Sequence, residues 1–195
     1  MLRLVLVRPG VTVYDEQHRI QGTLDIPLSE HCRHQVVDQI ESLRALGPTH
    51  LVTSPSMASQ QTAEILGHAL QLKPRVIDRL ANIDLGLWQG SSIEEVKEKQ
   101  PKVFRQWQEF PESVRPPEGE TIAQAEDRVI ETLEKLRKKY RSEEVVLVVA
   151  PEPLASLVAH VSAGRQLGNL WLTSSMAGTC EVLEPTAAVS TPTVS

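Results

Sequence analysis

The stretch LRLVLVRPG, residues 2–10, is an apolar run that ends in a cation and a turn. Residues 2–7 are short, rich in leucine and valine and almost continuously apolar, which is typical of a strand buried on both faces of a sheet. Arg8 follows at once, and Pro9-Gly10 turns the chain. A cation placed there points toward a pocket at the strand's carboxyl end. The proline beside it can neither attack a substrate nor carry a proton.

Strands and helices alternate along the rest of the chain. The pattern predicts further strands at 50–54, 75–80, 144–150 and 179–184. It predicts helices at 29–46 with Ser29 as N-cap, 57–72, 91–110 with a break at Pro101, 120–141 and 153–164. This order indicates an α/β fold, a three-layer α/β/α sandwich around a mostly parallel sheet.

Composition narrows the function classes. The net charge is −5 and no basic stripe is evident, which argues against a nucleic-acid-binding protein. The basic run KLRKKYR, residues 135–141, ends a helical pattern, where cations complement the helix dipole. No apolar run reaches the roughly 18 residues of a membrane helix, and no signal peptide is evident, so we expect a cytoplasmic protein with no membrane partner. Cys32 and Cys180 have no metal-ligand spacing and are interpreted as reduced thiols, and no metal or cofactor is expected.

Four blocks of the sequence resemble the histidine phosphatase superfamily, the phosphoglycerate-mutase-like proteins. The first is RPGVTVYDEQHRIQGTLDIPLSE, which is similar to the family's Arg-His-Gly-x-Thr opening and its Gly-x-x-Asp-x-Pro-Leu continuation. VTSPSMASQQTAEIL resembles its Ser-Pro-x-x-Arg-x-x-Gln-Thr-Ala segment. RLANIDLGLWQG and PPEGET resemble two later segments. The resemblance covers roughly residues 2–184 and implies a single phosphoglycerate-mutase-like domain over 1–184, with a helical cap at about 88–119 and a disordered tail at 185–195.

The resemblance also implies a chemistry, and the positions that carry it are replaced here. Members of the family form a phosphohistidine, hold the phosphoryl group with arginines and a second histidine, and protonate the leaving group with a carboxylic acid. The nucleophilic histidine falls at Pro9, the second arginine at Ala58, the acid at Asn82 and the second histidine at Pro151. Losing a covalent nucleophile alone can cost about 10⁶ in rate. The resemblance therefore predicts a site that no longer transfers phosphoryl groups.

A remnant of the pocket remains in the sequence. It comprises Arg8, Gly10, Thr12, Asp15 and Glu152, of which Asp15 replaces a family asparagine and Glu152 a family glycine. Buried charges need partners, so we expect Arg8 to form an internal ion pair with Asp15 or Glu152 in preference to binding phosphate. The two prolines are expected to stiffen the strand ends and make the pocket smaller and less polar.

Other candidate residues have simpler interpretations. His18 is the one histidine in the loop after Arg8 and is weighed as a residue near the pocket. Glu94, Glu95 and Glu98 are interpreted as the charged face of a helix. Trp88 is assigned to core packing. Trp107 and Phe110, in the expected cap, are the better candidates for a ligand or partner surface.

Three hypotheses follow. The first is an inactive phosphatase-like protein, a pseudoenzyme that binds a protein or small ligand of unknown identity. The second is a phosphomonoesterase with rebuilt chemistry that uses Asp15, Glu152 or His18. The third is a structural homodimer subunit.

Overall fold

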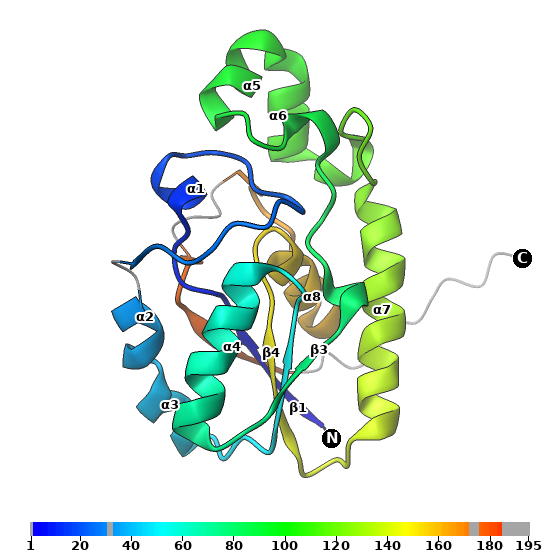
Figure 1. Cartoon of the computed structure of the whole chain (residues 1–195). Helices are drawn as coiled ribbons and strands as arrows, with labels where there is room; N and C mark the ends of the chain where they lie inside the picture. Colours follow the sequence, from blue (N-terminus) through cyan, green and yellow to red (C-terminus); the bar gives the residue numbers. More distant parts are fainter. Residues whose placement is uncertain (1, 31–32, 172–175, 185–195) are drawn as a thin grey trace, which may run out of the picture.

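A computed structural model describes residues 2–30, 33–171 and 176–184 (Figure 1). Cys32 and the tail at 185–195, which the sequence predicts to be disordered, lie outside these residues. No helix among the described residues is both long enough and apolar enough to span a bilayer.

The sheet has five strands in the order β3-β2-β4-β1-β5. β5 is antiparallel to β1, and the other neighbours are parallel. The bounds are β1 Arg3–Val7, β2 His50–Thr53, β3 Pro74–Val76, β4 Val145–Val149 and β5 Cys180–Leu183. All five expected strands are present. The third is shorter than predicted, because the chain turns into a 3₁₀ helix at Asp78–Leu80.

Eight α-helices connect the strands in the described part of the chain. Their bounds are α1 Val13–Glu16, α2 Arg33–Asp38, α3 Ile40–Ala45, α4 Met57–Leu70, α5 Ile93–Lys99, α6 Pro101–Glu109, α7 Ile122–Lys139 and α8 Leu154–Ala163. Further 3₁₀ helices span Gly86–Trp88 and Pro111–Ser113.

One helix prediction is corrected, and one short helix was not predicted. The helix expected at 29–46 is interrupted at Gln39 and forms α2 and α3. The Ser29 hydroxyl donates to Glu16 Oε1 at 2.5 Å and ties the segment after α1 to that helix, while residues 31–32, which Ser29 is predicted to cap, lie outside the described residues. The short helix α1 has no sequence-based counterpart. Thr12 and Asp15 stabilise its first turn through a reciprocal capping box. A helix of four residues is too short to give a clear periodic pattern in the sequence.

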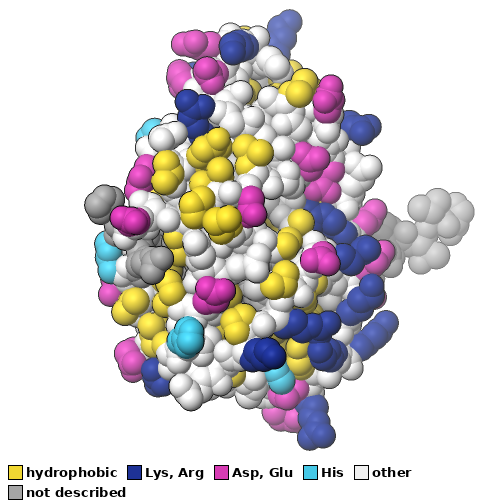
Figure 2. Space-filling view, in the orientation of Figure 1, with side chains coloured by type: hydrophobic (Ala, Val, Ile, Leu, Met, Phe, Trp, Pro, Cys, Tyr) yellow, Lys and Arg dark blue, Asp and Glu magenta, His cyan; other side chains and the backbone are white. Residues whose placement is uncertain are grey.

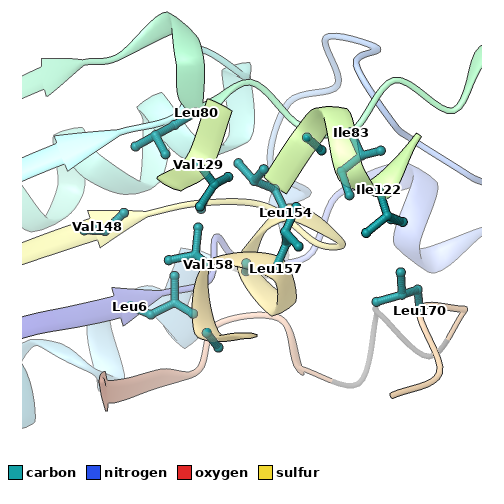
Figure 3. Packing of buried hydrophobic residues seen from close by; sticks show 14 of the residues in the cluster. Leu6, Leu80, Ile83, Ile122, Val129, Val148, Leu154, Leu157, Val158 and Leu170 are labelled. Carbon is teal, nitrogen blue, oxygen red and sulfur yellow. The ribbon is translucent and has the colours of Figure 1, made fainter. Parts of the chain in front are cut away.

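The sheet separates two hydrophobic clusters, which confirms the three-layer α/β/α prediction. Alternate residues of β1 divide between them: Leu4 and Leu6 pack with α7 and α8, whereas Val5 and Val7 pack with the α2–α4 side. Figure 3 shows Leu154, Leu157 and Val158 of α8 between α7 and the strands β1 and β4. The long helix α7 therefore covers one face of the sheet and supports α8.

The segment with α5 and α6 lies over the carboxyl ends of the strands and is attached by aromatic packing (Figure 1). Trp88 and Trp107 meet edge-to-face at 5.5 Å between ring centroids, and Phe104 stacks on Trp171 at 5.0 Å. The core assignment of Trp88 is confirmed. Of the two candidates for a ligand or partner surface, Trp107 is 1% exposed and packs in this cluster, whereas Phe110 is 57% exposed.

Replacing Trp107 with Ala should destabilise the protein by about 3–5 kcal/mol, because the change leaves a large cavity inside the aromatic cluster. Phe110→Ala should cost less than about 1 kcal/mol, because most of that ring already contacts water. Urea unfolding measures both changes. Equal losses in the two variants would contradict the packing described here.

Candidate functional site

The carboxyl ends of β1 and β4 lie side by side and form one wall of a pocket. Val7 is in register with Val149, and the Ala150 N–H donates to the Val7 carbonyl at 3.1 Å. This pairing brings Arg8-Pro9 next to Pro151. The pocket holds about 60 Å³, which is room for only a few water molecules.

The pocket collects all the predicted remnant residues and both prolines. They share its lining with apolar side chains from the segment above the sheet and from the chain after α8. The lining includes Arg8, Pro9, Gly10, Thr12, Asp15, Pro151 and Glu152 together with Leu85, Ile93, Trp107, Leu170 and Trp171. The predicted remnant residues thus form part of the polar lining, to which the fold adds Arg19, Gln21 and the apolar side chains.

Arg8 is buried and held by two carboxylates. Its Nε lies 2.5 Å from Glu152 Oε1, and its side chain is 4% exposed against 7% for Glu152. A terminal nitrogen of Arg8 lies 2.9 Å from Glu181 Oε1 on β5. The predicted internal ion pair of Arg8 is confirmed for Glu152. The guanidinium that could bind an anionic substrate is already occupied.

The second oxygen of Glu152 is bound by the first turn of α8. Its Oε2 accepts hydrogen bonds from the Ser156 N–H at 3.1 Å and from the Ser156 hydroxyl at 2.7 Å. A helix N-terminus favours a negative charge, which adds to the attraction of Arg8. Glu152 therefore fills an anion-binding arrangement built from a guanidinium, a hydroxyl and a helix N-terminus.

Asp15 lies in the pocket wall but serves the backbone. Its Oδ2 accepts from the Thr12 N–H at 2.8 Å and from the Thr12 hydroxyl at 2.7 Å. No ion pair joins Asp15 to Arg8 among the described residues. The alternative partner predicted for Arg8 is thus wrong, because the capping box of α1 holds the Asp15 carboxylate instead.

Asn82 lies one layer behind the pocket and joins three loops. Its amide nitrogen donates to the carbonyls of Gly22 at 2.9 Å and Glu152 at 2.8 Å. Its amide oxygen accepts from the N–H groups of Ile83 at 2.9 Å and Leu154 at 3.2 Å. The side chain is 2% exposed. Its amide nitrogen meets only carbonyl acceptors, and its amide oxygen meets only N–H donors. A carboxylate at this position would face two carbonyl oxygens, so the geometry favours an amide.

Two further predicted residues do not reach the pocket. Ala58 is fully buried in the first turn of α4 and does not line it. His18 is exposed and also stays outside the lining.

Glu95 is one of three glutamates assigned to a charged helix face. Its carboxylate accepts a hydrogen bond from the Ser92 backbone N–H in the capping box of α5, and this bond lowers the pKa of the Glu95 carboxyl.

Glu181 is a site residue that sequence reasoning missed. It lies in the predicted last strand, but only the antiparallel pairing of Leu6 with Glu181 places it beside Arg8. Its other oxygen pairs with Arg165, which follows α8. Burial, and then the charge of Glu181, raise the pKa of the neighbouring Cys180 thiol. Within the described ranges, no group of three or more His, Cys, Asp or Glu side chains could hold a metal ion.

Comparisons with known proteins identify the family of this chain. The model of the histidine phosphatase superfamily (branch 1) matches residues 4–189. The chain belongs to this superfamily. It is 33% identical over 171 residues to phosphoserine phosphatase 1 of Hydrogenobacter thermophilus, which covers 88% of this chain and 81% of that protein. It is also 31% identical over 129 residues to a probable phosphoglycerate mutase GpmB of Cronobacter sakazakii, which spans 66% of this chain and 60% of the mutase.

Solved structures give the same fold. Bacillus stearothermophilus YhfR superposes with a TM-score of 0.83 at 25% identity, covering 96% of this chain and 93% of that one. A mycobacterial glucosyl-3-phosphoglycerate phosphatase solved with VO₃ has a TM-score of 0.79 at 29% identity, over 87% of this chain and 85% of that one. The phosphoglycerate-mutase-like fold predicted from the sequence is confirmed.

Replacing Asn82 with Asp should destabilise the protein by about 2–4 kcal/mol at pH 7, since a buried carboxylate would face the carbonyls of Gly22 and Glu152. Burial beside carbonyl oxygens raises the pKa of this carboxyl in the folded protein, so the loss should shrink as the pH falls from 7 toward about 4, the ordinary pKa of Asp in the unfolded chain, because the protonated acid can donate. Urea titrations at several pH values measure this. Asn169→Asp is the matched control, because the Asn169 oxygen only accepts a hydrogen bond from Trp171 N–H. A stable Asn82→Asp protein would contradict the assigned role.

Replacing Glu152 with Ala should cost about 2–4 kcal/mol and leave an empty anion site between Arg8 and Ser156. Formate should restore part of the lost thermal stability, whereas chloride at equal ionic strength should not. The double variant Arg8→Ala/Glu152→Ala serves as the control, because it lacks the cation. Equal recovery in the single and double variants would disprove a specific anion site.

Proposed function

We propose that this member of the superfamily binds a protein or a small ligand and does not transfer phosphoryl groups through a phosphohistidine. The family's motifs, laid on this sequence, put Pro9 at the nucleophile and Pro151 at the second histidine. Neither ring can accept a phosphoryl group. Both prolines line the pocket beside Arg8, which supports the proposal.

The observation that carries this proposal is the occupied guanidinium of Arg8. A phosphate monoester brings a charge of roughly −1.5 to −2, and binding it requires a surplus of cations. The charged groups in the lining are Arg8, Arg19, Asp15 and Glu152, which sum to no net charge. Glu181 lies next to Arg8 as well, and its charge is balanced by Arg165. The pocket thus lacks the positive potential that a phosphate substrate requires.

The position of the leaving-group acid supports the same proposal. The family's motif places this acid at Asn82, and an amide cannot donate a proton to a leaving group at neutral pH. Both ends of the amide are already engaged with the backbone, which leaves no free donor directed into the pocket.

A phosphomonoesterase with rebuilt chemistry has less support. It requires two of Asp15, Glu152 and His18 to approach each other in an open cleft. Asp15 is engaged by Thr12 and Glu152 by Arg8, while His18 is exposed outside the pocket lining. The pocket's volume of about 60 Å³ also leaves little room for a phosphoester.

Purified protein should show no Arg8-dependent hydrolysis of p-nitrophenyl phosphate, phosphoserine, 3-phosphoglycerate or glucosyl-3-phosphoglycerate. The panel takes its substrates from the named activities of the relatives. Rates should lie on the order of 10⁵-fold or more below those of an active relative assayed in parallel. The Arg8→Ala variant detects contaminating phosphatase. Activity that is present in the native protein and lost in the variant would overturn the proposal.

A further inference from the structure

A second hollow lies at the edge of the sheet, between β3 and the C-terminal half of α7. Two adjoining cavities of about 300 and 510 Å³ share Arg75 and Val76 of β3. We call their combined surface the edge groove. α7 contributes Thr132 and Leu136 to it, and Tyr140 lines its other end.

Positive charge is concentrated along this groove. Figure 2 shows Lys and Arg side chains gathered over β3 and the C-terminal half of α7. The lining cations are Lys73, Arg75, Arg79, Lys135 and Lys139, against one lining carboxylate, Asp78. The chain as a whole carries a net charge of −5, so this surface has the opposite sign to the protein.

The preference of cations for the C-terminal end of α7, where they complement the helix dipole, explains only part of this cluster of positive charges. Lys139 lies in the last turn of that helix, but Lys73, Arg75 and Arg79 come from β3 and its flanks. Arg79 is paired with Glu131 at 2.7 Å. In the part of the chain that the structure describes, Lys73 and Arg75 form no ion pair. Lys135 lies 4.0 Å from the same Glu131 carboxylate. Among the described residues, Lys73 and Arg75 beside the strand and Lys139 on the helix are thus left without an ion-pair partner, and these unpaired cations attract an anionic partner.

The groove also offers apolar contact and an open sheet edge. Val76 is 42% exposed, and Leu136 lines the groove. The Ile77 N–H donates to Thr53 of β2, so the alternation along the strand turns the Val76 N–H and carbonyl away from β2. Cations, the exposed Val76 side chain and the outward-facing backbone groups of Val76 together fit an extended peptide with acidic and apolar side chains; Leu136, at 3% exposure, forms only the floor of the groove.

We propose that the edge groove binds a short acidic segment of a partner protein in an extended conformation. A long polyanion fits less well, because it would extend beyond the groove lining toward exposed carboxylates of α7 such as Asp127 and Glu134. A second copy of this chain fits less well too, because two identical edges would oppose Arg75 with like charges. This proposal rests on the sheet edge and is independent of the chemistry at Arg8.

The test uses fluorescence anisotropy with a labelled six-residue peptide of alternating Glu and Val, and with its Gln and Val counterpart. The acidic peptide should bind at least tenfold more tightly than the neutral one in 50 mM salt. Lys73→Glu/Arg75→Glu should weaken binding at least tenfold. Lys102→Glu/Arg105→Glu, an equal charge change on exposed positions of α6, should change it less than twofold.

Several results would overturn the proposal. They are absence of binding by the native protein, equal losses in the two double variants, or tighter binding to a DNA duplex or to anionic vesicles than to the peptide. Light scattering supplies a further test. A dimer that Lys73→Glu/Arg75→Glu converts to a monomer would assign the groove to a second copy. Circular dichroism of each variant verifies that loss of binding does not reflect unfolding.

Discussion

The buried ion pair between Arg8 and Glu152 is the constraint on which the rest of the site depends. Both side chains are nearly inaccessible to water, at 4% and 7% exposure, so each charge requires the other. Arg8 is the residue that directly follows β1, and Glu152 lies between β4 and α8. The pair thus ties two adjacent strand ends to the first turn of a helix. A carboxylate that the chain itself provides occupies the place where a fold of this kind presents cations to a ligand.

The surrounding structure is consistent with a filled site. Asn82 donates to the Glu152 carbonyl and holds the backbone that carries the carboxylate. Glu181 approaches Arg8 from β5 and is itself paired with Arg165. Trp107 and Trp171 cover the pocket with rings that also pack against each other. The charge of Arg8 is therefore balanced from within the chain, although the buried Glu181 Oε1 beside it makes no hydrogen bond, and the apolar wall restricts access to these groups.

Much of this arrangement could be predicted from the sequence. The continuous apolar runs at 2–7 and 144–150 identify buried parallel strands, and parallel strand ends gather their flanking residues at one edge. The strand ends bring Arg8 beside Pro151, and the resemblance to the family added Asp15 and Glu152, which line the same pocket. This reasoning did not decide which acid pairs with Arg8, because the capping role of Asp15 depends on a four-residue helix with little sequence signal. The sequence analysis missed Glu181, because the composition of an antiparallel edge strand does not reveal which residues it pairs with on the neighbouring strand.

A crystal structure grown in about 0.1 M phosphate would test the central claim most directly. The account predicts that Arg8 keeps its contacts with Glu152 and that no phosphate lies in the pocket between Arg8 and Pro151. A phosphate bound to the Arg8 guanidinium, with the Glu152 side chain turned away from it, would contradict the account. It would show that the pocket still accepts the anion for which its family is named.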